Sequence, residues 1–464
     1  GSNVRGTLQQ THATGGVNGT DDVGGLVGRS NDGAVVTESY ATGAVSGNGD
    51  SVGGLVGENT GGSTVDESYA RGTVSGGTTV GGLVGRNDAT VTDAYAVGRV
   101  SGTDTGGVVG VDDGGTVESV YWDAETTGRA ASSGSAARYG LPTERMTGLN
   151  ATVGLFEFDF EATWRPSATP GGYPSLASDS GFADELAAYD GLVAGDGSAA
   201  APYRISTVYE LQLVRVRLGE GDAFELAGDI DASSTAQWYD EGNGPQGFEP
   251  LGNDSTAFAG TLDGNGSAIT ALTVNRTTTD SVGLFGHLDS AGTLEDISLE
   301  RATVGGRGDV GGLVGNSSGT VDGSSVGGQV DGTTSVGGLV GNNTGTVTDS
   351  SASGPVNGTD YVGGLVGWSR AGATVTRSYA LGDVNGTGSQ IGGAVGRNDG
   401  TVRMAAATGA VDGDGNVGGL VGRNLDDGEV AQSYATGAAD GTDAGGLVGF
   451  NDGGNVTDTY ATGA

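Results

Sequence analysis

The sequence predicts an all-β fold, a right-handed parallel β-helix (β-solenoid) in two segments, on three observations. The hexapeptide VGGLVG and its variants occur eleven times. Their starts are 25–29 residues apart within each of two runs, and periods of this size are typical of solenoids and propellers. Each period contains short β-branched or aromatic stretches bounded by Gly, Asn or Asp, which are strand signals. The hexapeptides begin at Val23, Val52, Val80, Thr105, Ser281, Val310, Val336, Val362, Ile391, Val417 and Ala444.

Within one period the order of the pieces is constant. VGGLVG is followed by a polar turn, a stretch such as VTDAYAVG, and a short AVSG-like stretch. Three short strands per period predict one coil of 25–29 residues, with coils about 4.8 Å apart. The two glycines are then expected at a bend where the backbone is tight, often of positive φ, and close to its neighbours. A phosphate-binding loop would need a following helix and a Lys-Ser/Thr pair, and neither is present.

An aromatic residue recurs at one position of the second stretch. It is Tyr in seven coils, His12 holds the place in the first coil, and Ser351 and Ala405 interrupt the series. Rings in this register are expected to stack along one face, although a sugar-stacking strip is an alternative interpretation. The tyrosines are Tyr40, Tyr69, Tyr95, Tyr121, Tyr379, Tyr434 and Tyr460.

Two segments fall outside the repeat and divide the chain. We predict a solenoid segment over 1–120, an aromatic-rich tail over 121–180, an opening cap over 181–280, and a second solenoid segment over 281–464. The tail is expected to cover the end of the first coil stack. The cap contains the one predicted helix, STVYELQLVRVR, with Ser206 or Thr207 as its N-cap and Glu210 near the capping-box position.

The composition indicates a strongly saline environment. Acidic residues outnumber basic ones by 57 to 20, every basic residue is arginine, and the formal charge is −37. The Debye length falls to about 3 Å at 1 M salt, so crowded carboxylates repel one another little there. We therefore expect a halophilic source. Nucleic acid and anionic membranes are excluded as direct partners because both require a basic surface.

Other sequence features bear on location. The chain has no cysteine, and no apolar stretch approaches the roughly 20 residues of a membrane helix, so no membrane insertion is expected. Ten Asn-x-Ser/Thr triplets favour an extracellular, glycosylated protein, although a chain rich in Asn, Ser and Thr also forms such triplets by chance. The candidate N-glycosylation sites are Asn18, Asn150, Asn253, Asn265, Asn275, Asn316, Asn342, Asn357, Asn385 and Asn455.

No set of residues indicates catalysis or a cofactor. The carboxylates lie in turns at varying offsets, whereas glycosidases need two acids at a fixed separation. Two histidines, His12 and His287, in different segments do not indicate a triad or zinc site. The stretch DGDGN at Asp412–Asn416 lacks the glycine and glutamate of an EF-hand, which leaves weak calcium binding in turns. We expect no enzyme, no catalytic residue, no cofactor and no dedicated metal site.

These motifs resemble those of the GLUG-motif repeat proteins, which include adhesin-like surface proteins of bacteria and archaea. The similarity covers nearly the whole chain through the hexapeptides, the SYATG-like stretches from Ser39, Ser68, Ser378 and Ser433, the YWD at Tyr121–Asp123 and the DGNG at Asp263–Gly266. The resemblance implies an extracellular β-solenoid without catalytic residues. Together with the charge it predicts a halophilic archaeon as the source.

The order of the parts suggests how the protein works. The tail precedes the cap, and the opening stretch THATG matches the closing stretch TYATG. Two uncovered coils invite pairing, so we expect head-to-tail homo-polymers through end coils containing His12 and Tyr460. The chain would be a filament subunit or an adhesin whose other partners are surface glycans or neighbouring cells. Alternatives are an excised piece of a longer tandem protein, a passive stalk, or a carbohydrate-active enzyme, which a groove with clustered carboxylates and an Arg would favour.

Overall fold

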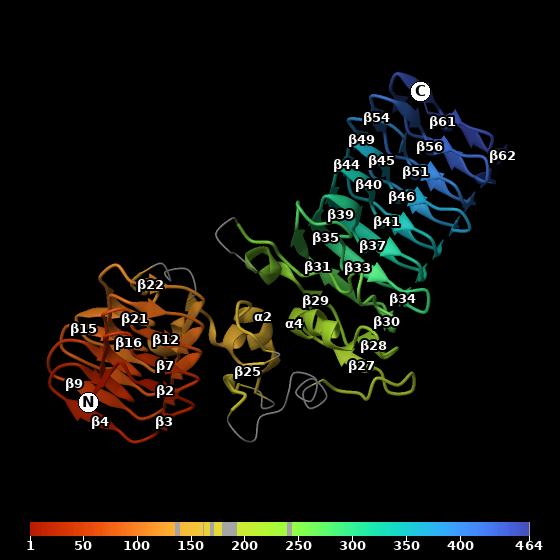
Figure 1. Cartoon of the computed structure of the whole chain (residues 1–464). Coiled ribbons are helices and arrows are strands. Elements are labelled where there is room, and N and C mark those ends of the chain that lie inside the picture. The colour runs from red at the N-terminus through yellow and green to blue at the C-terminus, as the bar shows by residue number, and fades with distance from the viewer. Residues whose placement is uncertain (135–139, 161, 168–170, 179–192, 239–243, 464) are drawn as a thin grey trace. The chain divides into compact units, whose positions relative to one another are not determined.

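The computed structural model describes residues 1–134, 140–160, 162–167, 171–178, 193–238 and 244–463. It divides into two compact units, Gly1–Leu192 (unit 1) and Val193–Ala464 (unit 2). Each unit contains a stack of coils, and the strands of these coils pair in parallel with their equivalents in the next coil (Figure 1). The predicted all-β solenoid fold is confirmed. None of the helices among the described residues is long and apolar enough to cross a membrane.

Unit 1 contains five columns of parallel strands, so a complete coil has five short strands rather than the predicted three. The first column is β1 (Ser2–Val4), β6 (Val27–Asn31), β11 (Val56–Asn59), β16 (Val84–Asn87) and β21 (Val109–Asp112). The second is β5 (Val23–Gly24), β10 (Val52–Gly53), β15 (Thr79–Gly81) and β20 (Asp104–Gly106). The next is β2 (Thr7–Gln9), β7 (Val35–Thr37), β12 (Thr64–Asp66), β17 (Thr90–Val91) and β22 (Thr116–Val117). The tyrosine column is β3 (His12–Ala13), β8 (Tyr40–Ala41), β13 (Ser68–Ala70), β18 (Ala94–Ala96) and β23 (Val120–Asp123), extended by β24 (Gly140–Leu141). The last is β4 (Val17–Gly19), β9 (Val45–Gly47), β14 (Val74–Ser75) and β19 (Val100–Ser101).

Unit 2 repeats this plan over more coils. One column is β27 (Tyr203–Ile205), β28 (Ala223–Leu226), β30 (Thr261–Asp263), β34 (Thr293–Glu295), β38 (Thr320–Asp322), β42 (Thr346–Thr348), β47 (Thr374–Thr376), β52 (Thr401–Arg403), β57 (Glu429–Ala431) and β62 (Asn455–Thr457). The hexapeptide strands form two columns. One is β33 (Phe285–Leu288), β37 (Val314–Ser317), β41 (Val340–Asn343), β46 (Val366–Ser369), β51 (Val395–Asn398), β56 (Val421–Asn424) and β61 (Val448–Asn451). The other is β36 (Gly308–Gly311), β40 (Thr334–Gly337), β45 (Asp360–Gly363), β50 (Ile391–Gly392), β55 (Asn416–Gly418) and β60 (Asp443–Gly445).

The remaining strands of unit 2 form one branched sheet. It begins with β29 (Ile230–Asp231), β31 (Ala268–Thr270), β32 (Thr273–Asn275), β35 (Ser298–Gly305) and β39 (Ser325–Asp331). Beyond β39 it splits into the unit 2 tyrosine column, β43 (Ser351–Ala352), β48 (Tyr379–Ala380), β53 (Ala406–Ala407), β58 (Tyr434–Ala435) and β63 (Tyr460–Ala461), and a second column, β44 (Val356–Gly358), β49 (Val384–Gly386), β54 (Val411–Gly413) and β59 (Ala439–Asp440).

The hexapeptide spans two strands and the corner between them, which accounts for one of the additional strands. Its Val and Leu side chains fill the interior, and Val52, Leu55 and Val56 are fully buried. A Cβ on Gly54 would lie 2.1 Å from the carbonyl oxygen of Gly82 and 2.8 Å from the Cβ of Ala70. The glycine pair is therefore required by the close approach of neighbouring coils.

The expected positive φ is found elsewhere. Neither middle glycine of any hexapeptide has φ in the left-handed region in the described part of the chain. That conformation falls on the residue before many hexapeptides, such as Asp22, Ser51 and Asp309, and on the residue two before the tyrosine position, such as Glu38. The corner at the glycines turns without a left-handed residue, so the sequence prediction of positive φ there is wrong.

The opening cap of unit 2 begins with the predicted helix. Thr207 is its N-cap: the Thr207 hydroxyl accepts the backbone N–H of Glu210, and the Glu210 carboxylate accepts the N–H of Thr207, completing a capping box. The α-helix α4 (Val208–Gln212) then continues as a 3-10 helix, η3 (Leu213–Arg217). The side chain of Gln212 exchanges two 2.8 Å hydrogen bonds with the backbone of Glu249, which ties the helix to the following loop. A further 3-10 helix of the cap is η4 (Ser233–Gln237).

The tail of unit 1 is irregular, with short helical turns that the pattern does not predict. They are α1 (Ala124–Thr127), η1 (Thr143–Met146), η2 (Gly148–Asn150) and α2 (Ala151–Gly154), followed by the antiparallel pair β25 (Trp164–Arg165) and β26 (Ser175–Leu176). The YWD motif itself belongs to a coil strand, β23. The division drawn at 180/181 falls in 179–192, outside the described residues.

Candidate functional site

The aromatic residues stack in register along unit 1. Ring centroids are 5.0 Å apart for His12 and Tyr40, 4.7 Å for Tyr40 and Tyr69, and 5.1 Å for Tyr69 and Tyr95, with interplanar angles of 2–9°. Parallel rings at this spacing follow directly from the separation of the coils. The predicted stacking of these rings is confirmed.

Unit 2 carries a shorter version of this stack. Tyr434 and Tyr460 are stacked with centroids 5.2 Å apart, and Tyr379 pairs in register with Ala406. The interrupting residue is thus Ala406 and not Ala405. Ala405 occupies the preceding position, because its backbone N–H donates to the Ser433 hydroxyl just as the N–H of Thr11 donates to the Ser39 hydroxyl.

The tail packs along the side of the tyrosine column as well as at its end. Trp164 lies 6.2 Å from Tyr69 and 5.6 Å from Tyr95 between ring centroids, and Phe158 lies 5.2 Å from Tyr121. Arg71 lies 4.4 Å above the Tyr69 ring and donates to the Pro174 carbonyl oxygen at 2.6 Å. The tail therefore covers one side of the tyrosine column in addition to the end that the sequence predicts it to cover.

The start of the tail closes the last coil of unit 1. The Ser132 hydroxyl accepts the backbone N–H groups of Val108 and Val109, at 3.2 and 2.8 Å, which in earlier coils bond to the next coil's carbonyl. The Arg129 guanidinium donates to the carbonyl of Val100, and the buried Trp122 ring covers Gly107. These contacts satisfy the backbone groups that an open coil would leave unpaired.

The first coil of unit 1 and the last coil of unit 2 each have an uncovered face among the described residues. In the first, Val4 is 52% exposed and His12 is exposed. In the last, Phe450 is 44% and Tyr460 is 56% exposed. Leu447 and Val448 of this coil are half-buried, whereas their equivalents one coil earlier, Leu420 and Val421, are fully buried. His12 and Tyr460, the two residues predicted at end coils, therefore each form the outer ring of a stack.

A ladder of asparagines runs beside the hexapeptide. The Asn398 amide donates to the Asn424 side-chain oxygen at 2.8 Å, and the Asn424 amide donates to Asn451 at 2.9 Å. In unit 1, the amide of Asn59 donates to Asn87 at 2.9 Å in the same way. The amides of Asn398 and Asn424 also bond to a carbonyl of their own turns, whereas the second bond of Asn59 goes to the carbonyl of Thr90 in the next coil. The ladder thus pairs buried amide N–H groups from coil to coil. The sequence analysis did not identify this ladder, although Asn recurs three residues after the last Val of most hexapeptides.

The candidate glycosylation sites differ in accessibility. Six of the asparagines are exposed: Asn18, Asn253, Asn265, Asn275, Asn385 and Asn455. Three others are half-buried: Asn150, Asn316 and Asn357. Asn342 is only 6% exposed, and its side-chain oxygen accepts the Arg370 Nε at 2.9 Å. A glycan at Asn342 would have to displace packed side chains, so glycosylation of Asn342 is not expected in the folded chain.

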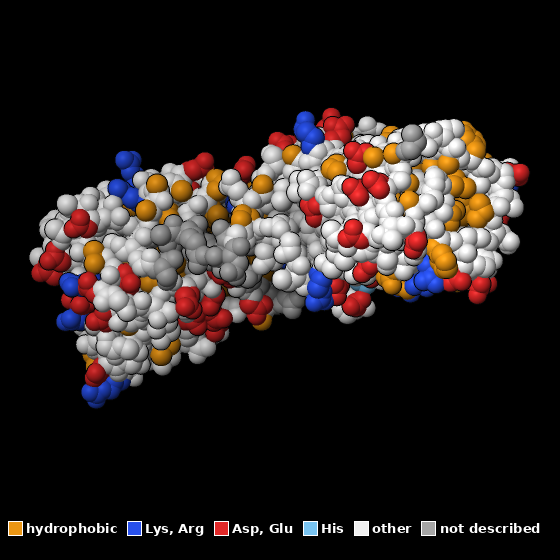
Figure 2. All heavy atoms as spheres, turned by 90° about the horizontal axis from the view of Figure 1, so that it is seen from above, with side chains coloured by type: hydrophobic (Ala, Val, Ile, Leu, Met, Phe, Trp, Pro, Cys, Tyr) orange, Lys and Arg blue, Asp and Glu red, His pale blue; other side chains and the backbone are white. Residues whose placement is uncertain are grey.

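Carboxylates are scattered over both units on the face drawn in Figure 2. Asp112 and Asp113 accept bonds from Asn87 and Arg86, while Asp426 and Asp427 are exposed. His287 pairs with Asp254 at 3.1 Å, and His12 belongs to the ring stack of the other unit. Among the described residues no three His, Asp or Glu side chains are grouped as a metal site would require. The expectation that the chain is not an enzyme stays a prediction.

Asp93 has a strongly raised pKa, and we expect it to make unit 1 sensitive to pH. Partial burial, followed by the nearby Asp66, Glu67 and Glu157, raises its pKa from 3.8 to about 6. The folded state therefore binds the proton more tightly than the unfolded state, and stability is lost as pH rises from about 4 to about 6.

We expect Asp93→Asn to stabilise unit 1 at pH 7. The substitution removes the charge, and Asn tolerates the left-handed backbone at this position (φ 45°). Because Asp93 is only half-buried and solvent screens its charge, we expect a gain of about 1 kcal/mol, together with a flatter stability profile between pH 4 and 7. Thermal unfolding across this pH range measures both effects. Glu118→Gln at an exposed position is the control, and an unchanged pH profile in Asp93→Asn would contradict the interpretation.

Comparison with known proteins agrees with this architecture. The family model for the GLUG motif matches residues 48–75, 76–101, 332–357 and 413–439. The halomucin of Haloquadratum walsbyi is 34% identical over 197 residues, which are 40% of this chain and 2% of that protein. A protein of Evansella cellulosilytica named as a Gly-rich membrane protein is 40% identical over 135 residues, 28% of this chain and 15% of that protein. The chain thus spans a small part of the length of either relative.

A solved structure of a Bacteroides ovatus protein, assigned as an immunoglobulin A1 protease, also matches. The similarity has a TM-score of 0.42 and 18% sequence identity, and it covers 56% of this chain and 86% of that chain. The family match falls on coils whose hexapeptides begin at Val52, Val80, Val336 and Val417, each of which is a strand, a glycine corner and a strand in the coil stack. The chain therefore contains GLUG-motif repeats in four places, and its repeats are stacked as a parallel β-solenoid.

Proposed function

We propose that the chain is an extracellular structural protein of a halophile whose copies stack head to tail into filaments. The observation that carries the proposal is a match between the two uncovered coil faces. The first coil reads SNVRGTLQQTHATG from Ser2, and the last reads FNDGGNVTDTYATG from Phe450, with no gap between equivalent strands. The last coil of one copy can therefore receive the first coil of another as its next coil.

Each column would continue across such a junction in the manner seen inside the units. The Asn451 amide bonds to Gly454 of its own turn, and the bond that interior asparagines make to a following coil would go to Asn3. The N–H of Thr459 would meet the Thr11 hydroxyl, as the N–H of Thr11 meets Ser39 at 3.1 Å. The Tyr460 ring would stack on His12, as His12 stacks on Tyr40.

The direction of the strands in the proposed junction is the same as between coils inside the units. In both units the later coil always pairs in parallel with the earlier one, and the head-to-tail arrangement keeps that polarity. A heterologous contact of this kind does not close on itself and produces an open filament. Uncovered β-edges otherwise promote unspecific pairing, and a specific partner removes that hazard.

The surface location rests on other evidence. One matched relative is halomucin from a halophilic archaeon, and another is named as a membrane protein. The formal charge of −37 suits a medium in which charges are screened. Exposed triplets at Asn18, Asn253, Asn265, Asn275, Asn385 and Asn455 would accept glycans outside the cell. An adhesive role toward neighbouring cells is compatible with such a filament, and the proposal includes no catalytic step.

The test is the assembly state of the 464-residue chain in molar salt. We expect concentration-dependent filaments in electron micrographs, with light scattering rising above a critical concentration. Monomers at every concentration would show that the coil faces do not join separate copies. That result would favour the alternative in which these coils continue within one longer tandem protein.

A further inference from the structure

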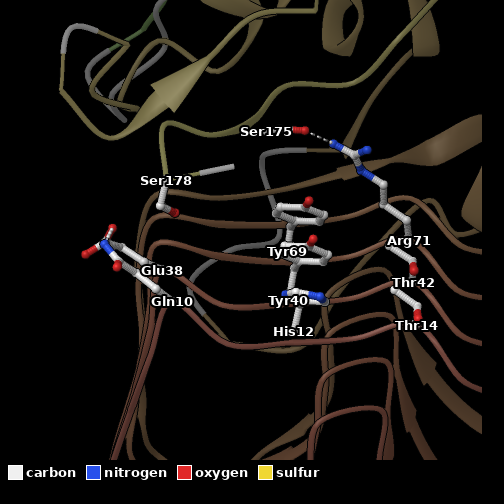
Figure 3. Close-up of a pocket in the computed structure, with 10 residues that line it drawn as sticks. All are labelled: Gln10, His12, Thr14, Glu38, Tyr40, Thr42, Tyr69, Arg71, Ser175 and Ser178. Atoms are coloured by element: carbon white, nitrogen blue, oxygen red, sulfur yellow. Dashed lines mark hydrogen bonds between the residues drawn. The ribbon is translucent and has the colours of Figure 1, made fainter. Parts of the chain in front are cut away.

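A groove runs beside the tyrosine column of unit 1 and is not explained by the stacking of coils. Its volume is about 630 Å³. The floor consists of the edges of the His12, Tyr40 and Tyr69 rings, which lie one above another in Figure 3. Ser175 and Ser178 of the tail lie at one end of the groove, beyond Tyr69.

The two walls repeat with the coils. Gln10 and Glu38 form one wall, and Thr14, Thr42 and Arg71 form the other (Figure 3). The Glu38 carboxylate accepts the side-chain N–H groups of Gln10 at 2.9 Å and Gln9 at 3.0 Å, and these bonds lower its pKa. Arg71 is fixed above the Tyr69 ring by its bonds to Pro174 and Ser175. The walls therefore present amide, hydroxyl, carboxylate and guanidinium groups in fixed positions.

The faces that the His12, Tyr40 and Tyr69 rings turn toward one another are already occupied by stacking, so they do not offer a flat platform to a ligand. Centroid separations of 4.7–5.0 Å leave no room for a ligand between the rings. What reaches the groove is the ring edge, which carries partial positive charge, together with the phenolic hydroxyl. Such a floor suits a ligand with many oxygen atoms along its length.

We propose that this groove binds an unbranched neutral glycan lying along the axis of the coil stack. Polar groups recur at the spacing of the coils, about 4.8 Å, so a polymer of pyranose units can repeat the same contacts from coil to coil. Sugar hydroxyls donate to Glu38 and accept from Gln10, Thr14 and Thr42. An acidic glycan is disfavoured because Glu38 and the net charge of −37 repel it.

An extended peptide fits this groove less well. Peptides that bind β-proteins usually add a strand to a free sheet edge, but here the strands β3, β8 and β13 cross beneath the groove and pair with one another. A peptide repeats every 3.3 Å or so, which does not match the coil spacing. The proposal goes beyond the filament function and does not depend on it.

The experiment measures binding of cellohexaose to the full chain by calorimetry in molar salt, at a protein concentration where the chain is monomeric. We expect a Kd below about 1 mM, and an affinity about tenfold lower for Tyr40→Ala and for Glu38→Gln. Ser351 and Ala406 hold the position of Tyr40 in unit 2, so a small residue there is compatible with the coil. Glu38→Gln keeps the shape of the wall and tests the same site if Tyr40→Ala unfolds.

Tyr434→Ala in unit 2 is the matched control, because it removes an equivalent stacked ring outside the groove. Its affinity should equal that of the unsubstituted chain. No binding of cellohexaose, or equal binding by all variants, would overturn the proposal. Tighter binding of a hexagalacturonate or of an extended hexapeptide would overturn it in favour of an acidic glycan or a protein ligand. These binding results can be interpreted whether or not the chain assembles into filaments, because binding is measured on the monomer.

Discussion

Gln10→Arg lowers the critical concentration for filament assembly, and Gln10→Asp raises it. In the proposed junction, Gln10 lies one coil after Asp458, in the column that precedes the tyrosine position. The same column inside unit 2 places Arg377 one coil after Asp349, where two guanidinium nitrogens bind the carboxylate at 2.6 and 2.7 Å. Arginine at position 10 would repeat this pair across the junction, whereas aspartate would set a third carboxylate between Asp458 and Glu38.

The expected size follows from exposed ion pairs. A pair of this kind contributes up to about 1 kcal/mol, and a like-charge pair costs a similar amount. The two variants should therefore differ by about 2 kcal/mol per junction, which is about 30-fold in critical concentration. Light scattering at the lowest salt concentration that keeps the monomer folded measures this difference, because salt screens exposed charges.

A second substitution on the opposite face makes the test specific. Asp458→Arg in the Gln10→Asp chain restores an opposite-charge pair at every junction and should restore assembly. Gln432→Asp, in the same column but inside unit 2 beside Arg403, is the control and should assemble like the unsubstituted chain. Equal critical concentrations in all of these chains would show that the two coil faces do not meet. Thermal unfolding of each dilute monomer separates a weakened first coil from a weakened junction.

Gly338→Ala destabilises unit 2 by about 3 kcal/mol. A Cβ at this hexapeptide glycine would lie 2.3 Å from the carbonyl oxygen of Gly364 and 2.8 Å from the Cβ of Ala352. Both neighbours belong to backbone held in parallel sheets, so the clash is relieved only by separating two coils. The separation would also weaken hydrogen bonds between β40 and β45.

Hydrogen exchange is the suitable measurement, because a stack of coils can open locally without global unfolding. We expect faster exchange in β40, β45 and their neighbours, along with a lower melting temperature. Gly228→Ala is the control in the same unit: no atom lies within 4 Å of the added Cβ, and its φ is not in the left-handed region. Equal effects of the two substitutions would contradict the close-approach argument and leave only a general preference for glycine.

Much of the fold could be predicted from the sequence because equivalent positions of successive repeats pair with one another in the coil stack. Most hexapeptide Val residues lie over a Val, and most tyrosines lie over tyrosines, so the period and the aromatic stack follow directly from spacing. The capping box at Thr207 and Glu210 is likewise a local pattern, and it forms as predicted. The family resemblance depends on the same local motifs.

The errors share a physical cause. Three strands per coil were predicted where five form, because glycines divide the hexapeptide into two strands, and a left-handed residue such as Glu38 divides the second stretch into two more, such as β7 and β8. Positive φ was assigned to those glycines, but Asp22 and Ser51 adopt it, since a left-handed residue is needed before the strand and not at its corner. Close approach and turn geometry both favour glycine, and composition does not separate them. The residue that interrupts the tyrosine series is Ala406 and not Ala405, and only the strand pairing with Tyr379 shows this.

The repeat period, the stacked aromatic column and the acidic surface are determined by the sequence alone, because each depends on residues close together in the chain or on composition. The path of the tail was decided only in the tertiary structure, where Trp164 and Pro174 meet Tyr69, Tyr95 and Arg71 across about a hundred residues. The same holds for the groove beside Tyr40, whereas the two uncovered end coils were expected from the matching stretches THATG and TYATG. The path of the tail and the groove depend on which distant segments pack together, and no periodicity encodes that.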